Sequence, residues 1–409
     1  MNSAFRGLLV LLLGAVCGWA VVAHADRADF DFAAVFEGKT LDPATIEPDI
    51  LAFLDELNDG LRRHDAQAVA ALFDTDAWFA QVSHAYPEID TDEPIWQTVR
   101  KQSANIFGQN LTVPQANMAW IRSEIKAIEP THVENGFAVT MRHWDSDGIA
   151  SKNIIDLVRT PDGLRFYDLT QLDLGVRWSD IFASGIAAGQ MNRPGTQQSL
   201  LMAYGGVQAL AEGNSQLALE QLEQVNLEVL PSALRPMILT SFCEAYYDLG
   251  DVEKALGHVT ESLALYPEHP QPLAHYYRAA CLVDLERPDE ALVEAMRYAD
   301  LVGVDADIWV VVADAYMLQD RFDMGLSSYA KALDDDPQHY EALLYYLFFL
   351  GDDQKHEFRP RYEAVENRTD IGALLAEDLD ALDDPAGLAA LCAMHRELHP
   401  GDTWPADYE

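Results

Sequence analysis

The chain has 409 residues, of which 49% are hydrophobic, so it is long and apolar enough for two or three domains with buried cores. Its charge is strongly unbalanced, because 67 acidic residues against 27 basic ones give a formal net charge of −40. Nucleic acid and anionic lipid both require a basic surface, so the composition excludes them as partners. Two interpretations stay open: a surface that attracts basic ligands, and an acidic exterior that serves only solubility.

The N-terminus is typical of an export signal. Residues 1–25 carry one arginine, an apolar run over 8–22 and the small-residue sequence Ala23-His24-Ala25, which predicts a signal peptide cleaved before Asp26. We therefore expect a secreted, periplasmic protein without membrane insertion after cleavage. Two alternatives are an uncleaved anchor, for which the apolar run is short, and lipid attachment at Cys17.

After a lead-in at 26–45, residues 46–188 predict a domain of mixed secondary structure. Apolar residues at helical spacing open it, namely Ile50, Phe53, Leu54, Leu57 and Leu61. The period then changes to 2, which predicts strands at 119–129, 136–144, 151–160 and 164–173. Helices followed by antiparallel strands indicate an α+β domain.

This element order, with the opening LNDGLRRHDAQAVAALF at 57–73, resembles the ketosteroid-isomerase-like cone fold of the nuclear-transport-factor superfamily. The resemblance implies a curved sheet that wraps helices around a pocket. In such a pocket His143 or Asp156 could act as a general base, which would make the domain a small-ligand receptor or an isomerase-like enzyme. The alternative is that both are ordinary strand residues.

A linker at 189–198 precedes a different pattern. The stretch 236–267 holds two apolar runs at helical spacing, separated by Gly250-Asp251, which predicts an antiparallel helix pair. A small residue opens the second helix of four such pairs, at steps of 37, 36 and 34 residues: Ala218, Ala255, Ala291 and Gly325. Tandem pairs of this kind resemble the tetratricopeptide repeat family.

The resemblance implies stacked hairpins over 199–337, degenerate repeats and capping helices over 338–400, and a tail at 401–409. The predicted fold class is thus two-domain, an N-terminal α+β domain followed by an all-α helical solenoid.

In this family the first helices line a concave groove. Carried over to this chain, the groove positions are Met237, Thr240, Glu244, Tyr247, Leu273, Tyr276, Val283, Asp307, Val310, Asp314 and Met317. Such an apolar, aromatic and acidic wall favours a partner protein or peptide with apolar anchors and a Lys or Arg. The Lys and Asn clamp that some members use for a peptide carboxylate is missing at these positions. An alternative is that the groove is filled by the chain's own N-terminal domain or C-terminal helices.

Cysteines and histidines indicate no cofactor. Cys243 and Cys281 each lie on the apolar face of a first helix, where a buried thiol is expected and a disulfide bridge is the alternative. The spacing of Cys392, His395 and His399 could hold zinc on one helix face, but core packing at a terminal helix explains it better. We therefore predict a non-enzymatic interaction scaffold of the bacterial envelope. The alternatives are ligand or isomerase chemistry in the cone, and a purely structural subunit of an oligomer.

Overall fold

The computed structural model describes nine stretches of the chain, residues 41–86, 94–112, 118–144, 150–172, 176–180, 195–211, 213–230, 234–266 and 271–402. The predicted signal peptide and most of the predicted linker at 189–198 lie outside these stretches. The chain divides into two compact units. The first comprises Met1–Cys281 and Met296–Gly303, and the second comprises Leu282–Ala295 and Val304–Glu409.

The first unit opens with helices α3 (Pro48–Arg62), α4 (Ala66–Ala71), α5 (Thr75–Ala85) and α6 (Pro94–Leu111). Helix α3 begins with a proline in its first turn and buries Ile50 and Leu57 along one face. The next two helices begin at aspartate caps, because the carboxylates of Asp65 and Asp74 accept hydrogen bonds from the backbone N–H groups three residues on.

A five-stranded antiparallel sheet follows, in the order β1 (Arg122–Pro130), β2 (Gly136–Trp144), β3 (Ala150–Thr160), β4 (Gly163–Gln171) and β5 (Val176–Arg177). The four longer strands confirm the period-2 pattern of the sequence. The β3–β4 hairpin is tight because Gly163 adopts a φ of 115°, which favours glycine. A bulge in β4 follows from the register, in which Asp156 pairs with Asp168 but Leu157 pairs with Phe166.

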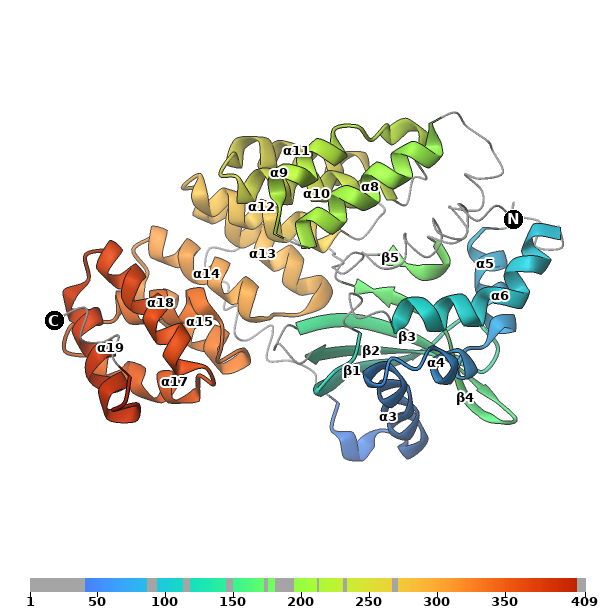
Figure 1. Cartoon of the computed structure of the whole chain (residues 1–409), viewed down its shortest axis with the longest axis horizontal. Helices are drawn as coiled ribbons and strands as arrows, with labels where there is room; N and C mark the ends of the chain where they lie inside the picture. Colours follow the sequence, from blue (N-terminus) through green and yellow to red (C-terminus); the bar gives the residue numbers. More distant parts are fainter. Residues whose placement is uncertain are drawn as a thin grey trace. The chain divides into compact units, whose positions relative to one another are not determined.

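The first four helices lie against one face of this sheet (Figure 1). The core between them is aromatic: the ring centroids of Phe73 and Phe107 are 4.4 Å apart, and those of Phe107 and Trp178 are 5.2 Å apart. A short parallel bridge between Phe73 and Phe166 joins the helical layer to β4. This arrangement bears out the α+β class, while the likeness to the cone fold stays a prediction.

Helix pairs continue the first unit. They are α8 (Thr196–Ala211) with α9 (Ser215–Leu222), and α10 (Arg235–Asp248) with α11 (Val252–Leu265). The small residues Ala218 and Ala255 are fully buried at the positions where the sequence predicted close approach. At Gly206 an added Cβ would lie 2.6 Å from Leu222, so the α8–α9 contact requires a glycine there. Helices α12 (Pro272–Asp284) and α13 (Pro288–Val302) form the next pair in the chain, and their residues are divided between the two units.

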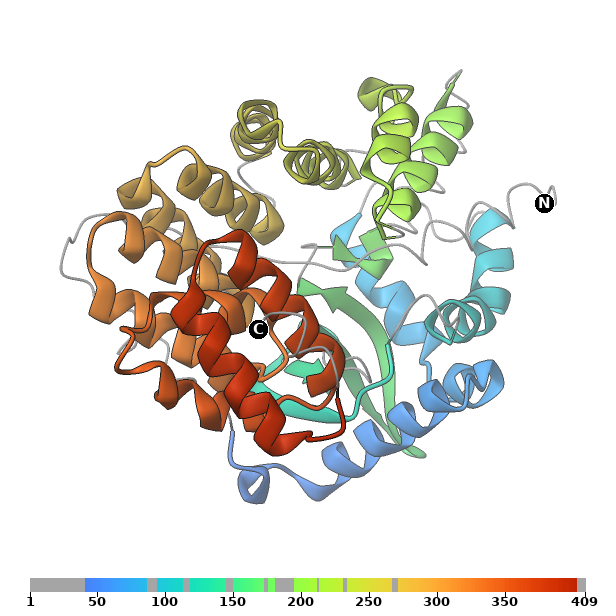
Figure 2. The same ribbon diagram turned by 60° about the vertical axis from the view of Figure 1, so that its left-hand side comes forward.

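The second unit contains α14 (Ala306–Leu318), α15 (Phe322–Asp335), α16 (Tyr340–Phe349), α17 (Arg359–Ala364), α18 (Arg368–Ala381) and α19 (Pro385–Leu398). Figure 2 shows the last pair, α18 and α19, in red. A proline inside a helical stretch kinks or interrupts it, and the stretch 355–366 contains Pro360. The structure has a 3-10 turn at Lys355–Phe358, and α17 begins so that Pro360 falls in its first turn, where its missing N–H costs no helical bond.

Tandem antiparallel helix pairs of tetratricopeptide size are therefore confirmed in both units. Among the described helices, none is long and apolar enough to cross a membrane.

Candidate functional site

The sheet positions the two candidate catalytic residues on opposite faces. His143 belongs to β2 and faces the helices, beside Trp120 at a ring-centroid distance of 5.2 Å. It lines a cavity of about 10 Å³ together with apolar side chains such as Leu57 and Leu169. Among the described residues neither ring nitrogen has a hydrogen-bond partner, and burial lowers the pKa of His143 to about 4. A ligand pocket needs hundreds of Å³, so this cavity does not accommodate a substrate.

Asp156 points to the other face of the sheet, where it forms a buried cluster with Asp168 and Arg177. The Arg177 guanidinium lies 3.1 Å from Asp156 Oδ2, and Asp168 Oδ1 accepts a 3.1 Å hydrogen bond from the Ser179 N–H. Burial raises the pKa of Asp156 to about 6 and that of Asp168 to about 7, although Arg177 opposes both shifts. His143 and Asp156 therefore cannot act on one substrate, and the predicted pocket chemistry gains no support from the described residues.

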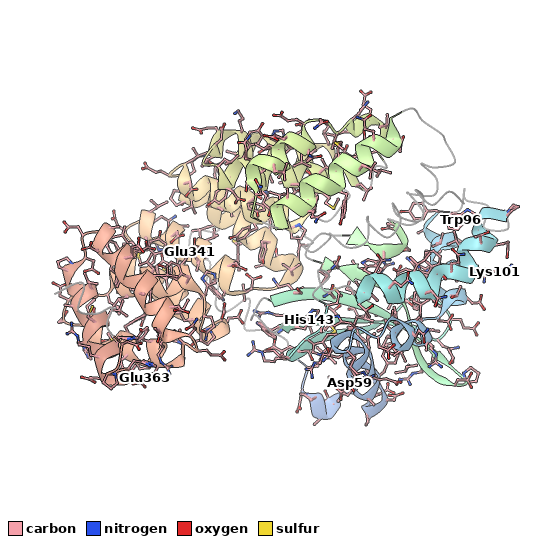
Figure 3. All side chains as sticks on the ribbon, viewed as in Figure 1. Asp59, Trp96, Lys101, His143, Glu341 and Glu363 are labelled. Carbon is pink, nitrogen blue, oxygen red and sulfur yellow. The ribbon has the colours of Figure 1, made fainter. Side chains whose placement is uncertain are left out.

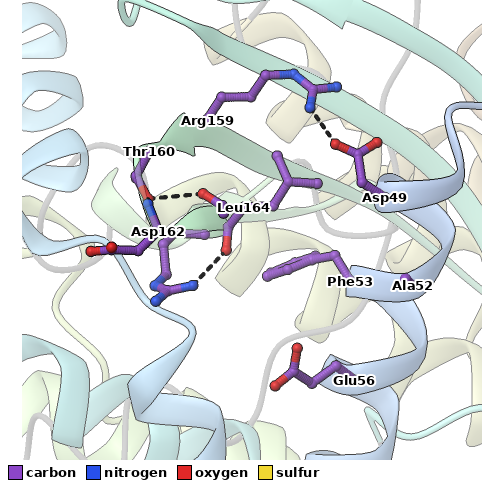
Figure 4. Close-up of a pocket in the computed structure, with 10 residues that line it drawn as sticks. Asp49, Ala52, Phe53, Glu56, Arg159, Thr160, Asp162 and Leu164 are labelled. Atoms are coloured by element: carbon purple, nitrogen blue, oxygen red, sulfur yellow. Dashed lines mark hydrogen bonds and ion pairs between the residues drawn. The ribbon is translucent and has the colours of Figure 1, made fainter.

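A larger hollow of about 360 Å³ lies at the surface between α3 and the β3–β4 hairpin (Figure 4). Its only long-range ion pairs among the described residues engage Arg159, which binds Asp49 and lies 2.7 Å from Glu47. The hollow is open to solvent, and the ion pairs of Arg159 bridge its rim.

The metal candidates at the C-terminus are occupied by protein contacts. His395 is fully buried: its Nδ1 lies 2.7 Å from the Tyr362 hydroxyl and its Nε2 lies 2.9 Å from Asp402 Oδ2. Arg368 Nε donates to His399 Nε2 at 3.0 Å. These contacts use both nitrogens of His395 and Nε2 of His399, and within the described chain no group of three potential ligands gathers.

In the first unit a row of tyrosines runs from the first helices α10 and α12 to the second helix α13. The distances between neighbouring ring centroids are 5.9 Å for Tyr247 and Tyr277, 5.3 Å for Tyr277 and Tyr276, and 6.1 Å for Tyr276 and Tyr298. The row ends on the sheet's own lysine: Lys152 Nζ donates to the Tyr298 hydroxyl at 3.1 Å and lies 5.0 Å from its ring centroid. One end of the tyrosine row is thus covered by the chain itself, as one alternative allowed.

The row also contains an unusual carboxyl group. Burial raises the pKa of Glu244 to about 7, with a further contribution from the negative charge of Asp248, while a hydrogen bond with Tyr277 opposes the rise. Elsewhere on the predicted groove, Met237, Leu273 and Val283 are partly buried, whereas Thr240 is 6% exposed and donates to its own helix at Pro236 O. Thr240 therefore offers no surface group.

In the second unit, two predicted groove residues are also buried. Val310 is 4% exposed, and Met317 packs on Gly325 of the hairpin partner, where an added Cβ would meet Met317 Cε at 2.7 Å. Asp307 is exposed and lies 3.2 Å from His339 Nε2. The structure thus buries Val310 and Met317, so these two predicted groove residues offer no open surface to a partner.

Asp314 is mostly buried and belongs to a larger group that the sequence did not reveal. We define the acidic–aromatic cluster as Asp284, Asp314, Glu341, Tyr345 and Asp378. These residues come from α12, α14, α16 and α18, and all four carboxylates act electrostatically on Tyr345. Figure 3 labels Glu341 among the helices of this unit.

The cluster is negative, and the imidazole of His339 is a basic group that acts on its Asp314 and Glu341 carboxylates. Burial raises the pKa of Asp314 to about 7; the Tyr329 hydroxyl opposes the rise by donating a hydrogen bond, whereas Glu341 and Asp284 add to it. Within the described part of the chain, no lysine or arginine forms an ion pair with any of the four carboxylates. The aromatic rings of Tyr329, Tyr345 and Phe349 lie within 6.4 Å of one another and provide an apolar side to the cluster.

No protein-family model matches the chain, and neither does any curated protein sequence. Several solved structures are similar to about half of it. "MamA 41-end from Desulfovibrio magneticus RS-1" is 20% identical, with a TM-score of 0.33, and covers 46% of this chain and 97% of its own. The structure from "Functional Characterization of Pseudomonas Aeruginosa pilF" is 12% identical, with a TM-score of 0.36, and covers 52% of this chain and 96% of its own. A thermophilic TPR protein from Thermus thermophilus is 18% identical, with a TM-score of 0.31 and coverages of 42% and 89%. TM-scores this low do not establish a shared fold, so the fold assignment depends on the helix pairs of this chain.

Proposed function

We propose that the helical repeats form a non-enzymatic scaffold that binds another protein, and that the bound segment presents a lysine or arginine to the acidic–aromatic cluster. The observation that carries the proposal is the gathering of Asp284, Asp314, Glu341 and Asp378 around Tyr345, where the described residues supply no lysine or arginine partner and only the imidazole of His339 acts on Asp314 and Glu341. Carboxylates held close together repel one another, and a cation placed between them relieves that repulsion.

The aromatic side of the cluster supports the same partner chemistry. A lysine or arginine can pair with Asp314 or Glu341 while its alkyl stem and charge rest on the ring of Tyr345. The first unit supplies an internal example, since Lys152 lies on the ring and hydroxyl of Tyr298. The net charge of −40 argues against a second copy of this chain as the occupant and favours a basic segment.

The cellular setting of this scaffold follows from the N-terminus. The apolar run over 8–22 and the small residues before Asp26 support export, so we infer that the scaffold serves protein assembly in the bacterial envelope.

Site-specific photocrosslinking in the native cell tests the proposal. Benzoylphenylalanine at Tyr345 is compared with the same group at Phe322, which is 51% exposed on the second helix α15. We expect an adduct from position 345 whose crosslinked peptide contains Lys or Arg, and whose yield falls at high salt and in the Asp314→Asn background. Equal adducts from both positions, or a crosslinked peptide without a basic residue, would refute this binding site. An adduct recovered only from the cytoplasm would refute the envelope location alone.

A further inference from the structure

Two thiols face one another inside the first unit. Cys243 on α10 and Cys281 on α12 are both fully buried and belong to one core cluster with Ala255, Val259 and Ala274. Both are free thiols, and their side chains are hydrogen-bonded to each other. They come from the first helices of consecutive repeats, so the contact spans the junction between those repeats.

The repeat pattern makes this junction distinctive. Shifting Cys243 and Cys281 by one repeat toward the N-terminus, with the steps of 37 and 36, leads to Gly206 and Ala245. Shifting them toward the C-terminus, with the steps of 36 and 34, leads to Ala279 and Ala315. The position of Cys243 holds a small residue in each of these repeats, and at Gly206 it packs closely on Leu222 of the second helix α9. The position of Cys281 is alanine in α10 and α14, whereas the first repeat has Gln208 there. Cysteine fits both positions as a small apolar side chain, and its thiol adds a reactivity that alanine lacks.

We propose that Cys243 and Cys281 form a disulfide that ties α10 to α12. The oxidant is a disulfide donor of the thiol–disulfide exchange class. The thiolate of one cysteine attacks the donor and releases one donor thiol, and the second cysteine then displaces the other donor thiol from the mixed disulfide. The two cysteines lose two protons and two electrons in total, and the donor disulfide is reduced to two thiols.

The bond forms while the repeats assemble rather than afterwards. Burial, together with the hydrogen bond to Cys281, raises the pKa of Cys243 well above its usual range. A buried neutral thiol reacts slowly with an external disulfide, so the folded repeats protect whichever redox state they enclose. Once formed, the bond sets the spacing of the helices that present Glu244 and Tyr277, whatever partner the groove binds.

The test uses the full-length chain and oxidised glutathione as the donor. The reduced chain is unfolded in urea, refolded in a mixture of oxidised and reduced glutathione, denatured again, alkylated and digested without reduction. We expect a peptide pair joined through Cys243 and Cys281, with Cys392 alkylated. The thermal unfolding midpoint of the oxidised wild type should also lie above that of the reduced wild type.

Single variants provide matched controls. In Cys243→Ala and in Cys281→Ala the difference between oxidised and reduced midpoints should vanish, since alanine occupies the equivalent positions in other repeats. In Cys392→Ala the difference should persist. The peptide map of the refolded wild type can overturn the proposal by itself. It does so if Cys243 and Cys281 are both alkylated, if either carries a stable glutathione adduct, or if either is linked to another cysteine.

Discussion

Replacing Asp314 with asparagine should make the second unit less sensitive to rising pH. Burial and the neighbouring carboxylates raise the pKa of Asp314 from 3.8 to about 7. Between these values the folded chain holds a proton that the unfolded chain releases, so stability falls as pH rises through this window and the loss is complete above it. Asparagine has a similar volume, and its Oδ1 still accepts the hydrogen bond from the Tyr329 hydroxyl.

The magnitude follows from linkage. One pKa unit corresponds to about 1.4 kcal/mol, so the wild type should lose roughly 2 kcal/mol more than Asp314→Asn between about pH 5.5 and about pH 8. Hydrogen exchange of the α14 and α15 amides, read by mass spectrometry, measures the opening free energy of this unit alone. Asp323→Asn removes an exposed carboxylate from α15 with the same charge change, and its stability should follow the wild type at both pH values.

An equal fall in the opening free energy of the wild type and of Asp314→Asn between the two pH values would refute a raised pKa of Asp314. If Asp314→Asn is less stable than the wild type by the same amount at both pH values, the Asp314 carboxylate serves only as a hydrogen-bond acceptor for the Tyr329 hydroxyl. The cation-binding interpretation of the acidic–aromatic cluster would then lose its electrostatic basis.

Two further predictions concern the sheet. Arg177→Met should destabilise the first unit by about 3 kcal/mol or more above pH 7, because it leaves Asp156 and Asp168 buried without a counter-charge. This loss of stability should be smaller at about pH 5.5, because the pKa values of Asp156 and Asp168, about 6 and about 7, keep both carboxyls mostly protonated there. Thermal unfolding at the two pH values measures the loss. A loss of the same size at both pH values would contradict this explanation. His143→Leu should raise stability by about 1 kcal/mol, since it removes buried nitrogens without partners. Because the pKa of His143 is lowered from 6.5 to about 4, the wild type should lose stability as the pH falls through that range, and His143→Leu should not. If His143→Leu instead has a lower thermal unfolding midpoint than the wild type at every pH, the contact of His143 with Trp120 outweighs the cost of its unpaired nitrogens.

Periodicity along the chain was enough to predict the elements themselves. The steps of 37, 36 and 34 between Ala218, Ala255, Ala291 and Gly325 predicted the helix pairs, because two helices can pack closely only where side chains are small. Alternation predicted the four long strands, because successive side chains of a strand point to opposite faces. Both signals are local, so they survive in a single sequence.

The separation of His143 from Asp156 depended on register, which alternation alone does not provide. Pairing of His143 with Ser151 places the odd-numbered residues of β3 on the face of His143, and Asp156 falls on the other face. A shift of one residue would have placed both candidates on the same face, although Asp156 pairs with Ala138, five positions along β2 from His143.

The acidic–aromatic cluster depended on stacking between repeats. Asp284, Asp314, Glu341 and Asp378 lie on different helices at unequal sequence separations, so no single-repeat pattern relates them. The same limit explains Val310 and Met317, which share a helix with Asp314 but are buried. Helical spacing shows which residues share a stripe, whereas the rotation of each helix against its neighbours determines which stripe meets solvent, and that rotation is set by side-chain packing across the whole solenoid.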